Sequence, residues 1–254
     1  MKKADELFKA TASTPLALAT QNNNAMGYFI PEYQRDYDWS KENIERLYFD
    51  ILNGFCRLRD SNDASAYTFL GTIILVQQQA SEPEFDGVSL EVIDGQQRIT
   101  TLTLIACVLC ELIKHQTERT GFSTLKEKTR KWLEDEIGYW RMAMYSCAVG
   151  SQSVDVTSSY PFARIIREGD SRGKTHFNSE YRSSIGKILE EFSKYFKEKK
   201  DEFSFEQFDN SESTKKIRDN YTFLRQLIFG LNDKEWYEDT DCELFDIDWL
   251  YRSQ

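Results

Sequence analysis

The sequence has no long apolar run. A helix that crosses a membrane needs about 20 consecutive apolar residues, and the longest candidate, residues 99–113, is interrupted by threonines and a glutamate. The first residues, 1–6, lack the apolar core of a signal peptide. We therefore expect neither a membrane protein nor a secreted one, and we expect the chain to be cytoplasmic.

Glycine, proline and cysteine are all scarce. The 254 residues include 12 Gly and 4 Pro, which excludes a low-complexity chain and favours helices. The five cysteines are odd in number and lie mostly among apolar residues, which indicates reduced thiols rather than a disulfide framework. Cys107 and Cys110 have the spacing of zinc ligands, but no second Cys/His pair lies nearby, so we expect them to be core thiols.

Negative charge is concentrated towards residue 254. The net charge is −10, and residues 201–254 hold 14 acidic and 6 basic residues, so they carry −8 of it. The remainder of the chain is nearly neutral. An acidic chain does not favour sequence-blind binding along a nucleic acid, which depends on contacts of Lys and Arg with phosphates. A local basic cleft is still compatible with this composition.

The first hundred residues alternate short strands and helices. Residues that favour β structure predict strands at 27–30, 67–76 and 90–93. The second of these is too apolar to be an edge strand with one face in water. Ser40 is a good helix cap, and apolar residues at helical spacing follow it as far as Leu52. The same spacing predicts a helix from about Gln96 to about Gln116.

The rest of the chain is predicted to be mainly helical. Spaced apolar residues within charged sequence predict helices at 125–140, 185–203 and 217–231. The expected fold class is therefore α+β. We expect a small mixed-sheet domain over residues 1–120 and a helical extension over residues 121–254.

A polar turn between the third strand and its helix is the first candidate site; residues 93–98 read IDGQQR. The first turn of a helix presents unpaired N–H groups and the positive end of the helix dipole. Gly95 lets a ligand approach the backbone, and Arg98 can bind phosphate oxygens with its guanidinium. The alternative is a helix cap without a ligand, in which Asp94 is the N-cap residue and Gln97 completes a capping box.

The second candidate site joins the first strand to its helix. Residues 30–39 contain three carboxylates, an arginine, a glutamine and three aromatic rings. Such a segment can bind a nucleotide: Arg35 supplies charge, Gln34 supplies hydrogen bonds, and a ring supplies a stacking face. Asp36 or Asp38 can hold Mg²⁺, which prefers oxygen ligands. The alternative is an ordinary turn, in which the rings anchor the core and Arg35 pairs with an aspartate.

The two motifs occur with a short apolar segment between them. Residues 30–39 read IPEYQRDYDW, residues 69–73 read FLGTI, and residues 93–102 read IDGQQRITTL. In this combination the chain resembles the N-terminal domain of GmrSD-type, modification-dependent (type IV) restriction enzymes, a family of bacterial anti-phage defence with a ParB/sulfiredoxin-like fold. The resemblance is best over residues 28–115, and residues 160–167 and 181–185 are similar to the later, helical part of the family.

The resemblance implies a ParB-like domain that binds a nucleoside triphosphate, GTP or ATP, and hydrolyses it with Mg²⁺. The implied nucleotide-binding residues are Gln34, Arg35, Gly95, Gln96, Gln97 and Arg98. The implied catalytic residues are Asp94, Gln97 and Arg98. Arg98 would stabilise charge on the phosphates, and Asp94 would position water or metal, with Asp36 as a second possible metal ligand. The family also implies recognition of modified, foreign DNA.

Family members that cut DNA usually carry a C-terminal HNH nuclease domain. This chain has only two histidines, His115 and His176, and lacks the motif, so we expect no nuclease activity of its own. The nuclease would be a C-terminal domain or a separate polypeptide, and a homo-oligomer is also compatible with the sequence. The best candidates for contacts with DNA phosphates are Arg164, Arg167, Arg172 and Lys174. The alternative is that these residues belong to a solvated loop.

Two other functions fit the same residues. A non-catalytic sensor or adaptor would use the cleft to bind a DNA phosphate or a modified base, with affinity that depends on salt and without nucleotide turnover. A nuclease acting through the ParB-like cleft would nick DNA with a metal, and the nicking would disappear in an Asp94→Ala variant.

Overall fold

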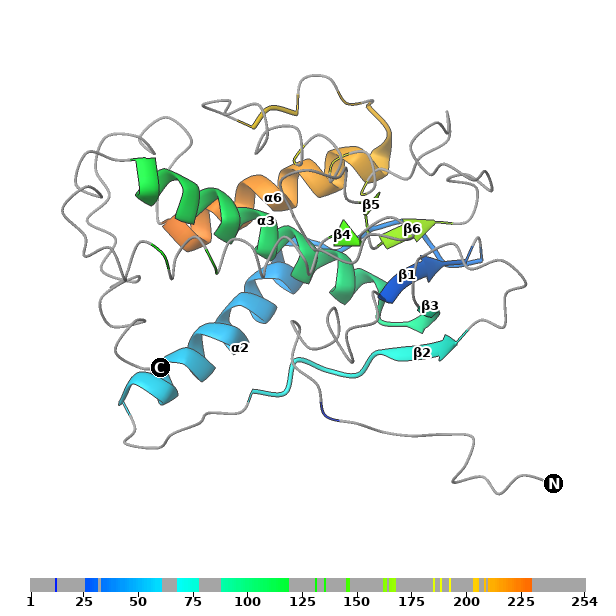
Figure 1. The fold of residues 1–254 in the computed structure, drawn as a ribbon, viewed down its shortest axis with the longest axis horizontal. Helices are drawn as coiled ribbons and strands as arrows, with labels where there is room; N and C mark the ends of the chain where they lie inside the picture. Colours follow the sequence, from blue (N-terminus) through cyan, green and yellow to red (C-terminus); the bar gives the residue numbers. More distant parts are fainter. Residues whose placement is uncertain are drawn as a thin grey trace.

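The structure of the protein is a computed structural model (Figure 1). It describes residues 12, 26–31, 33–60, 68–77, 88–118, 131, 135, 145–146, 162–163, 165–167, 185, 188, 192, 203–205, 208 and 210–229. Within this part of the chain the fold is α+β, as predicted. In Figure 1 the long helices lie together towards one end of the molecule, and the main sheet lies at the other end.

Four strands form a mixed sheet in the order β2-β3-β1-β6. The strands are β1 (Met26–Ile30), β2 (Ile74–Gln77), β3 (Val88–Asp94) and β6 (Ile165–Arg167). β1 is parallel to β3 and to β6, whereas β2 is antiparallel to β3. Two further short strands, β4 (Tyr145–Ser146) and β5 (Phe162–Ala163), pair with each other. Because β1 and β3 are parallel neighbours, the segments that leave their carboxyl ends emerge at the same edge of the sheet, where α/β proteins commonly bind ligands.

The long helices confirm three of the predicted ones. They are α2 (Lys41–Asp60), α3 (Gln96–Glu118) and α6 (Glu212–Phe229). Ser40 caps α2 as expected, since its carbonyl accepts the first helical hydrogen bond, from Ile44 N at 3.2 Å. Within the described residues, no helix is both long and apolar enough to cross a membrane.

The later part of the chain is described only in pieces. α6 begins five residues before the predicted helix at Ile217, because the hydroxyl of Ser211 accepts a hydrogen bond from Thr214 N and caps an earlier turn. The predicted helices at 125–140 and 185–203 fall largely outside the described residues. The described positions within them are helical: Lys131, Asp135, Ile185, Ile188 and Phe192.

The prediction for residues 67–76 is wrong in length and in position. Of the described residues 68–76, only those from Ile74 onward form a strand, and this strand lies at the edge of the sheet that the structure describes. Gly71 has φ +107°, a left-handed conformation that interrupts an extended chain. Ile74 and Val76 are 48% and 49% exposed, while Leu75 packs towards the core. A continuous apolar run therefore does not guarantee that both faces of a strand are covered.

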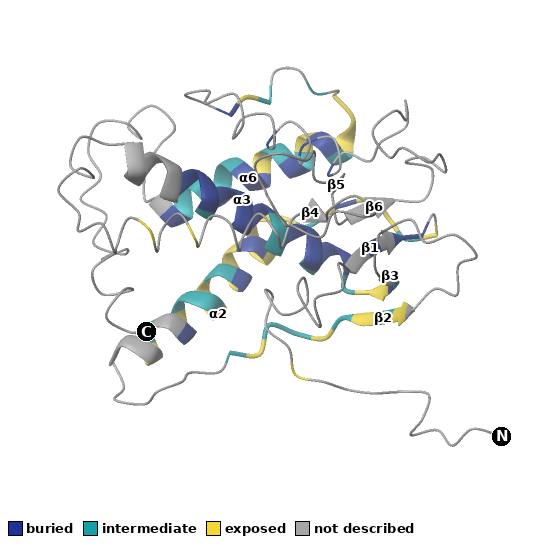
Figure 2. Ribbon diagram, in the orientation of Figure 1, coloured by how far each residue is buried: buried dark blue, intermediate teal, exposed yellow. Residues whose placement is uncertain are grey.

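The core is built around α3, which is buried along much of its described length (Figure 2). α2, β3, α3 and α6 all contribute core residues without solvent exposure, among them Ile44, Val92, Leu104, Cys107, Val108, Cys110 and Leu224. α6 contacts both α2 and α3. The prediction that Cys107 and Cys110 are core thiols is confirmed, and burial raises the pKa of Cys107 well above its usual value.

One carboxylate lies inside this core, where α3 meets α6. Glu111 has no solvent exposure. The Tyr221 hydroxyl donates a hydrogen bond to Glu111 Oε2 at 2.6 Å, and Arg225 Nη2 lies 3.5 Å from Glu111 Oε1. Burial, together with the Glu111 charge, raises the pKa of Tyr221 well above its ordinary value. Two residues of α6 therefore contact one buried carboxylate on α3, one by a hydrogen bond and one by an ion pair, which favours one alignment of the two helices.

Candidate functional site

The two motifs singled out in the sequence lie side by side at the carboxyl ends of β1 and β3. Gln34 Nε2 donates a hydrogen bond to the carbonyl of Ile93 at 2.7 Å. In the opposite direction, Gln96 Nε2 donates to the carbonyl of Arg35 at 2.6 Å. Residues that are about 60 positions apart in the sequence are thus joined directly, through side-chain amides and backbone carbonyls.

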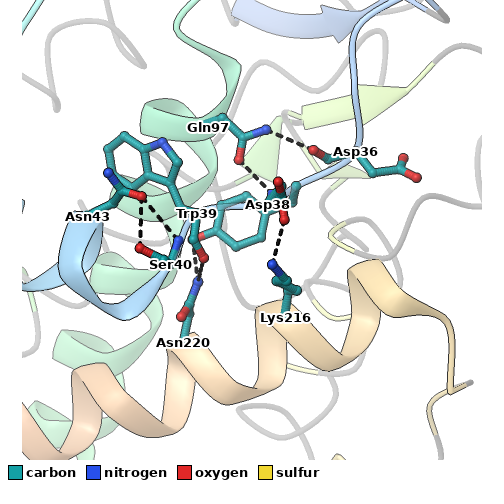
Figure 3. Close-up of polar contacts among 9 residues, drawn as sticks. Asp36, Asp38, Trp39, Ser40, Asn43, Gln97, Lys216 and Asn220 are labelled. Carbon is teal, nitrogen blue, oxygen red and sulfur yellow. Dashed lines mark hydrogen bonds and ion pairs between the residues drawn. The ribbon is translucent and has the colours of Figure 1, made fainter.

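Gln97 makes two hydrogen bonds between the motifs (Figure 3). Its Oε1 atom accepts a hydrogen bond from Asp38 N at 2.8 Å, and its Nε2 atom donates to the carbonyl of Asp36 at 2.8 Å. The residue is only 7% exposed. Both ends of one buried amide therefore hold the backbone of residues 36–38 against the first turn of α3.

The first turn of α3 is not the capping box that the sequence allowed. The carbonyl that accepts the first helical hydrogen bond belongs to Gly95, with Ile99 N as the donor at 3.0 Å. Gln97, the expected partner of Asp94, is occupied by residues 36–38. The Asp94 side chain is exposed, and no side chain or backbone group in the described part of the chain forms a hydrogen bond with it.

Gly95 has a specific role in this turn. Its φ of +94° lies in the region that side chains disfavour, and a Cβ atom at this position would approach Ile73 Cγ1 to 3.0 Å. Glycine therefore allows the chain to reverse from β3 into α3 while the segment before β2 packs closely beside it.

Arg98 is held in place by the same segment before β2. Its Nη1 atom donates a hydrogen bond to the carbonyl of Thr72 at 2.6 Å. The guanidinium lies over Gly71, where a Cβ atom would be 2.5 Å from Arg98 Cζ and 2.7 Å from Nη2. The sequence predicts a strand over residues 67–76, and this prediction does not indicate that Gly71 and Thr72 hold Arg98. The available signal was a glycine inside an apolar run, which often marks a close approach.

The turn has one closed side and one open side. Gln96 and Gln97 are buried beneath residues 34–38, whereas Asp94 is exposed and Gly95 and Arg98 are partly exposed. The first turn of α3 contains no acidic residue. The open side therefore combines a guanidinium with the positive end of a long helix, an arrangement that can bind a phosphate.

A magnesium ion fits this site only together with a phosphate. Among the described residues, no group of three His, Cys, Asp or Glu side chains is arranged to hold a metal. Asp94 and Asp36 are both exposed. Mg²⁺ is commonly held by one or two carboxylates plus water and substrate phosphates, so one exposed carboxylate beside a phosphate site is a sufficient protein contribution.

The three rings of residues 30–39 have different environments. Tyr37 is buried, and its hydroxyl lies 2.9 Å from Thr101 Oγ1; burial raises the pKa of Tyr37. Trp39 is partly buried against the core. Tyr33 is 68% exposed, and its hydroxyl donates a hydrogen bond to Glu91 Oε1 at 2.9 Å. The interpretation as core anchors therefore describes two of the rings, and Tyr33 projects outwards.

Asp38 is paired with a residue that the sequence did not indicate. Lys216 Nζ on α6 lies 2.5 Å from Asp38 Oδ1. The Lys216 ammonium lowers the pKa of Asp38, with a smaller contribution from Arg35, and Asp38 raises the pKa of Lys216. The pair is therefore complete at neutral pH. It is lost as the pH falls through the lowered pKa of Asp38, or rises through the raised pKa of Lys216.

The described structure includes one of the predicted DNA-contacting residues, Arg167, and places its backbone beside the second motif. Arg167 lies in β6, where it pairs with Ile30 of the parallel strand β1; its side chain is not described. Arg164, Arg172 and Lys174 fall outside the described residues. Their contact with DNA stays a prediction.

Residues 17–248 match the family described as GmrSD restriction endonuclease, N-terminal domain. No curated protein matches the chain. The family match includes both motifs, the strands of the sheet and α6, and so most of the chain.

Proposed function

We propose a nucleotide-dependent function from the premise that this chain belongs to the GmrSD restriction endonuclease N-terminal domain family. Membership makes the chain a component of a DNA-targeting restriction system. The further proposal is that it binds a nucleoside triphosphate at the turn of residues 94–98, hydrolyses it with Mg²⁺, and thereby controls a nuclease. In this proposal the sheet with α2 and α3 is a ParB/sulfiredoxin-like domain.

The observation that carries the proposal is the fixed position of Arg98. Its guanidinium is held by the Thr72 carbonyl and fits the space above Gly71. A preorganised cation loses little freedom on binding, and it requires no rearrangement as charge develops on a phosphate. The adjoining N-terminus of α3 favours the same kind of ligand.

The other residues of the two motifs divide into two groups. Asp94 is exposed beside the turn, so we assign it to a water molecule or to Mg²⁺, with Asp36 as a further candidate for the metal. Arg35 is exposed on the facing segment and would contact the phosphates. When bound, the ion would neutralise charge on the phosphate oxygens.

Gln34, Gln96 and Gln97 form the second group. Their amides are hydrogen-bonded to the backbone of the opposite motif. We therefore propose that they contribute to nucleotide binding and hydrolysis by holding the two segments in place, Gln97 most strongly because both of its amide atoms are engaged. In this proposal the three glutamine amides are needed to hold the two segments together, although they do not touch the nucleotide.

The proposed consequence of nucleotide turnover is control of an HNH nuclease, carried C-terminally or by a separate polypeptide, on modified foreign DNA in the cytoplasm. The same anion site would also suit a phosphate of DNA, so a non-catalytic DNA-binding module is the alternative. The two functions differ in a measurable way, because only the first consumes nucleotide.

The deciding experiment is a calorimetric titration of the wild-type chain with GTP, ATP, UTP and CTP in the presence of Mg²⁺. Phosphate release is measured on the same samples. Binding of at least one nucleotide, with release of phosphate, is the expected result. If the folded chain binds none of the four but binds DNA with a steep dependence on salt, the nucleotide proposal fails and the DNA-binding module replaces it.

Gly71→Ala should weaken nucleotide binding through Arg98. The added methyl group would occupy the space of the guanidinium, which must then leave its position. Since a hydrogen bond to a charged group is worth about 1.5–3 kcal/mol, we expect the dissociation constant to rise by roughly 10-fold or more, measured by calorimetry.

The control for Gly71→Ala is the same substitution made in an Arg98→Ala background. Without the guanidinium there is nothing to displace, so Gly71→Ala should change affinity little in that background. The unfavourable φ of Gly71 would still lower stability, by about 1–2 kcal/mol. A Gly71→Ala variant that loses stability but binds nucleotide like the wild type would contradict the role of Gly71.

A further inference from the structure

The segment between β1 and α2 is held from two opposite sides (Figure 3). On one side Gln97 binds the backbone of residues 36 and 38. On the other side α6 supplies side chains that contact residues 37–39. The two contacts meet at Asp38, whose backbone N–H binds Gln97 while its carboxylate binds Lys216.

Asn220 is the buried half of the contact from α6. It is 3% exposed. Its Nδ2 atom donates to the carbonyl of Trp39 at 2.8 Å and to the hydroxyl of Tyr37 at 3.1 Å. Both hydrogens of the amide group therefore bind residues 37–39. Asn220 can make both hydrogen bonds only when this segment has the observed conformation.

Lys216 is the more exposed half of the same contact. It precedes Asn220 by four residues, so the two side chains lie on the same face of α6. Other positions of α6 attach the helix to the rest of the fold. The Tyr48 hydroxyl of α2 donates to the carbonyl of Leu227 at 3.0 Å, and Tyr221 binds Glu111 of α3.

We propose that α6 is a positioning element of the nucleotide site, in which Lys216 and Asn220 hold residues 37–39 so that the bound nucleotide and the position of α6 are energetically coupled. The inference rests on the proposed function and adds a regulation to it. Few contacts connect the nucleotide site to α6: Gln97 in the first turn of α3 binds Asp38 N, and the Asp38 carboxylate binds Lys216 of α6. Any displacement of α6 that breaks the last contact releases the segment that Gln97 holds against the turn.

The coupling is reciprocal by thermodynamic necessity. If α6 stabilises the binding conformation of residues 36–39, a bound nucleotide must stabilise α6 in its observed position. A surface that contacts α6, on a nuclease or on another part of the same polypeptide, would then sense whether nucleotide is present. Coupling therefore predicts two effects that proximity alone does not: a change in α6 alters nucleotide affinity, and bound nucleotide alters the stability of α6.

The test uses a charge reversal that leaves the core intact. Lys216→Glu places a second carboxylate beside Asp38, and the double variant Asp38→Lys/Lys216→Glu restores an ion pair with the opposite polarity. Lys215→Glu is the matched control, since Lys215 is an exposed neighbour on the same helix and makes the same change in net charge. Two quantities are measured for the wild type and for each of these three variants: the amide hydrogen exchange of residues 36–39 and the dissociation constant for nucleotide.

In Lys216→Glu we expect the Asp38 amide to exchange about 10-fold faster and the affinity for nucleotide to fall by a similar factor. Lys215→Glu should behave like the wild type, and the double variant should recover both properties. In the wild type, nucleotide should slow the exchange of amides in α6.

Two results would overturn the inference. One is exchange of residues 36–39 that is equal in Lys216→Glu and Lys215→Glu, which would show that α6 does not position the segment. The other is a loosened segment with unchanged nucleotide affinity, which would show that the segment does not matter for binding. If the wild type binds no nucleotide, the proposed function fails, and the exchange data still decide whether α6 holds residues 36–39.

Discussion

Replacing Arg98 with alanine should nearly abolish nucleotide hydrolysis, with phosphate release reduced about 10³-fold. An arginine that stabilises charge in phosphoryl transfer contributes roughly 10³–10⁵ to the rate. We expect the lower end of this range, because Mg²⁺ and the N-terminus of α3 would remain in place. Nucleotide affinity should fall as well, by roughly 10-fold to 100-fold, the loss expected for a charged hydrogen bond. Calorimetry and a phosphate-release assay measure the two effects separately.

Two controls make this experiment specific. Arg98→Lys keeps the charge but loses the planar fork that reaches both the Thr72 carbonyl and a phosphate, so it should recover only part of the activity. Arg46→Ala removes an exposed arginine from α2 and should change neither property. An Arg98→Ala variant that folds normally and hydrolyses nucleotide within a few-fold of the wild-type rate would exclude the proposed role of Arg98.

The elements on either side of the site follow from local sequence. Ser40 and the helical spacing of the apolar residues after it predict α2. A short predicted strand followed by apolar residues at helical spacing from about Gln96 predicts the start of α3. Both helices are observed. These signals act over a few residues and depend on capping and periodicity. They locate the two polar segments at the ends of strands. They do not show that the segments touch each other.

The hydrogen-bond partners of Gln97 could not be predicted from the neighbouring sequence. Asp94 and Gln97 have the spacing of a capping box, yet Gln97 binds the backbone of residues 36–38 instead. A side-chain amide can satisfy one donor and one acceptor at the same time, so a segment that presents both competes well with a local cap. That competitor is about 60 residues away in the sequence, and only the resemblance to a family connected the two motifs.

Two further features of the site depend on contacts that no local pattern encodes. The close approach of Arg98 to Gly71 requires the segment before β2 to turn away from an extended course. The contact of α6 with residues 37–39 joins positions 178 to 183 residues apart. Helical periodicity predicted that a helix exists there, but it did not predict which surface that helix covers.

The second large effect is expected on stability, from Glu111→Ala. Removing one member of a buried charge pair leaves the other charge uncompensated, which typically costs about 3–5 kcal/mol. Here Arg225, whose side chain is only 12% exposed, would lose the carboxylate that faces it, and the Tyr221 hydroxyl would also lose its acceptor. We expect the free energy of unfolding, measured by urea denaturation, to fall by this amount.

Companion variants separate the charge from the cavity. Glu111→Gln keeps an acceptor for Tyr221 and fills the same space, so its cost should lie below that of alanine. Tyr221→Phe removes only the hydroxyl, with an expected cost of about 1–3 kcal/mol for a hydrogen bond to a charged group. If Glu111→Ala costs no more than Tyr221→Phe, the ion pair with Arg225 contributes nothing to stability.

The double variant Glu111→Leu/Arg225→Leu tests what the buried charges provide. Replacing both members of a buried pair with apolar residues is often neutral or stabilising, so this variant should recover the part of the Glu111→Ala loss that comes from Arg225, but not the part that comes from the Tyr221 hydroxyl, which still lacks its acceptor. It would retain the packing of α3 on α6 without the contact that aligns them. Because α6 also holds residues 37–39, a stable double variant with weakened nucleotide binding would show that the charges matter for the alignment of α6. Unchanged binding would show that packing alone places α6 correctly.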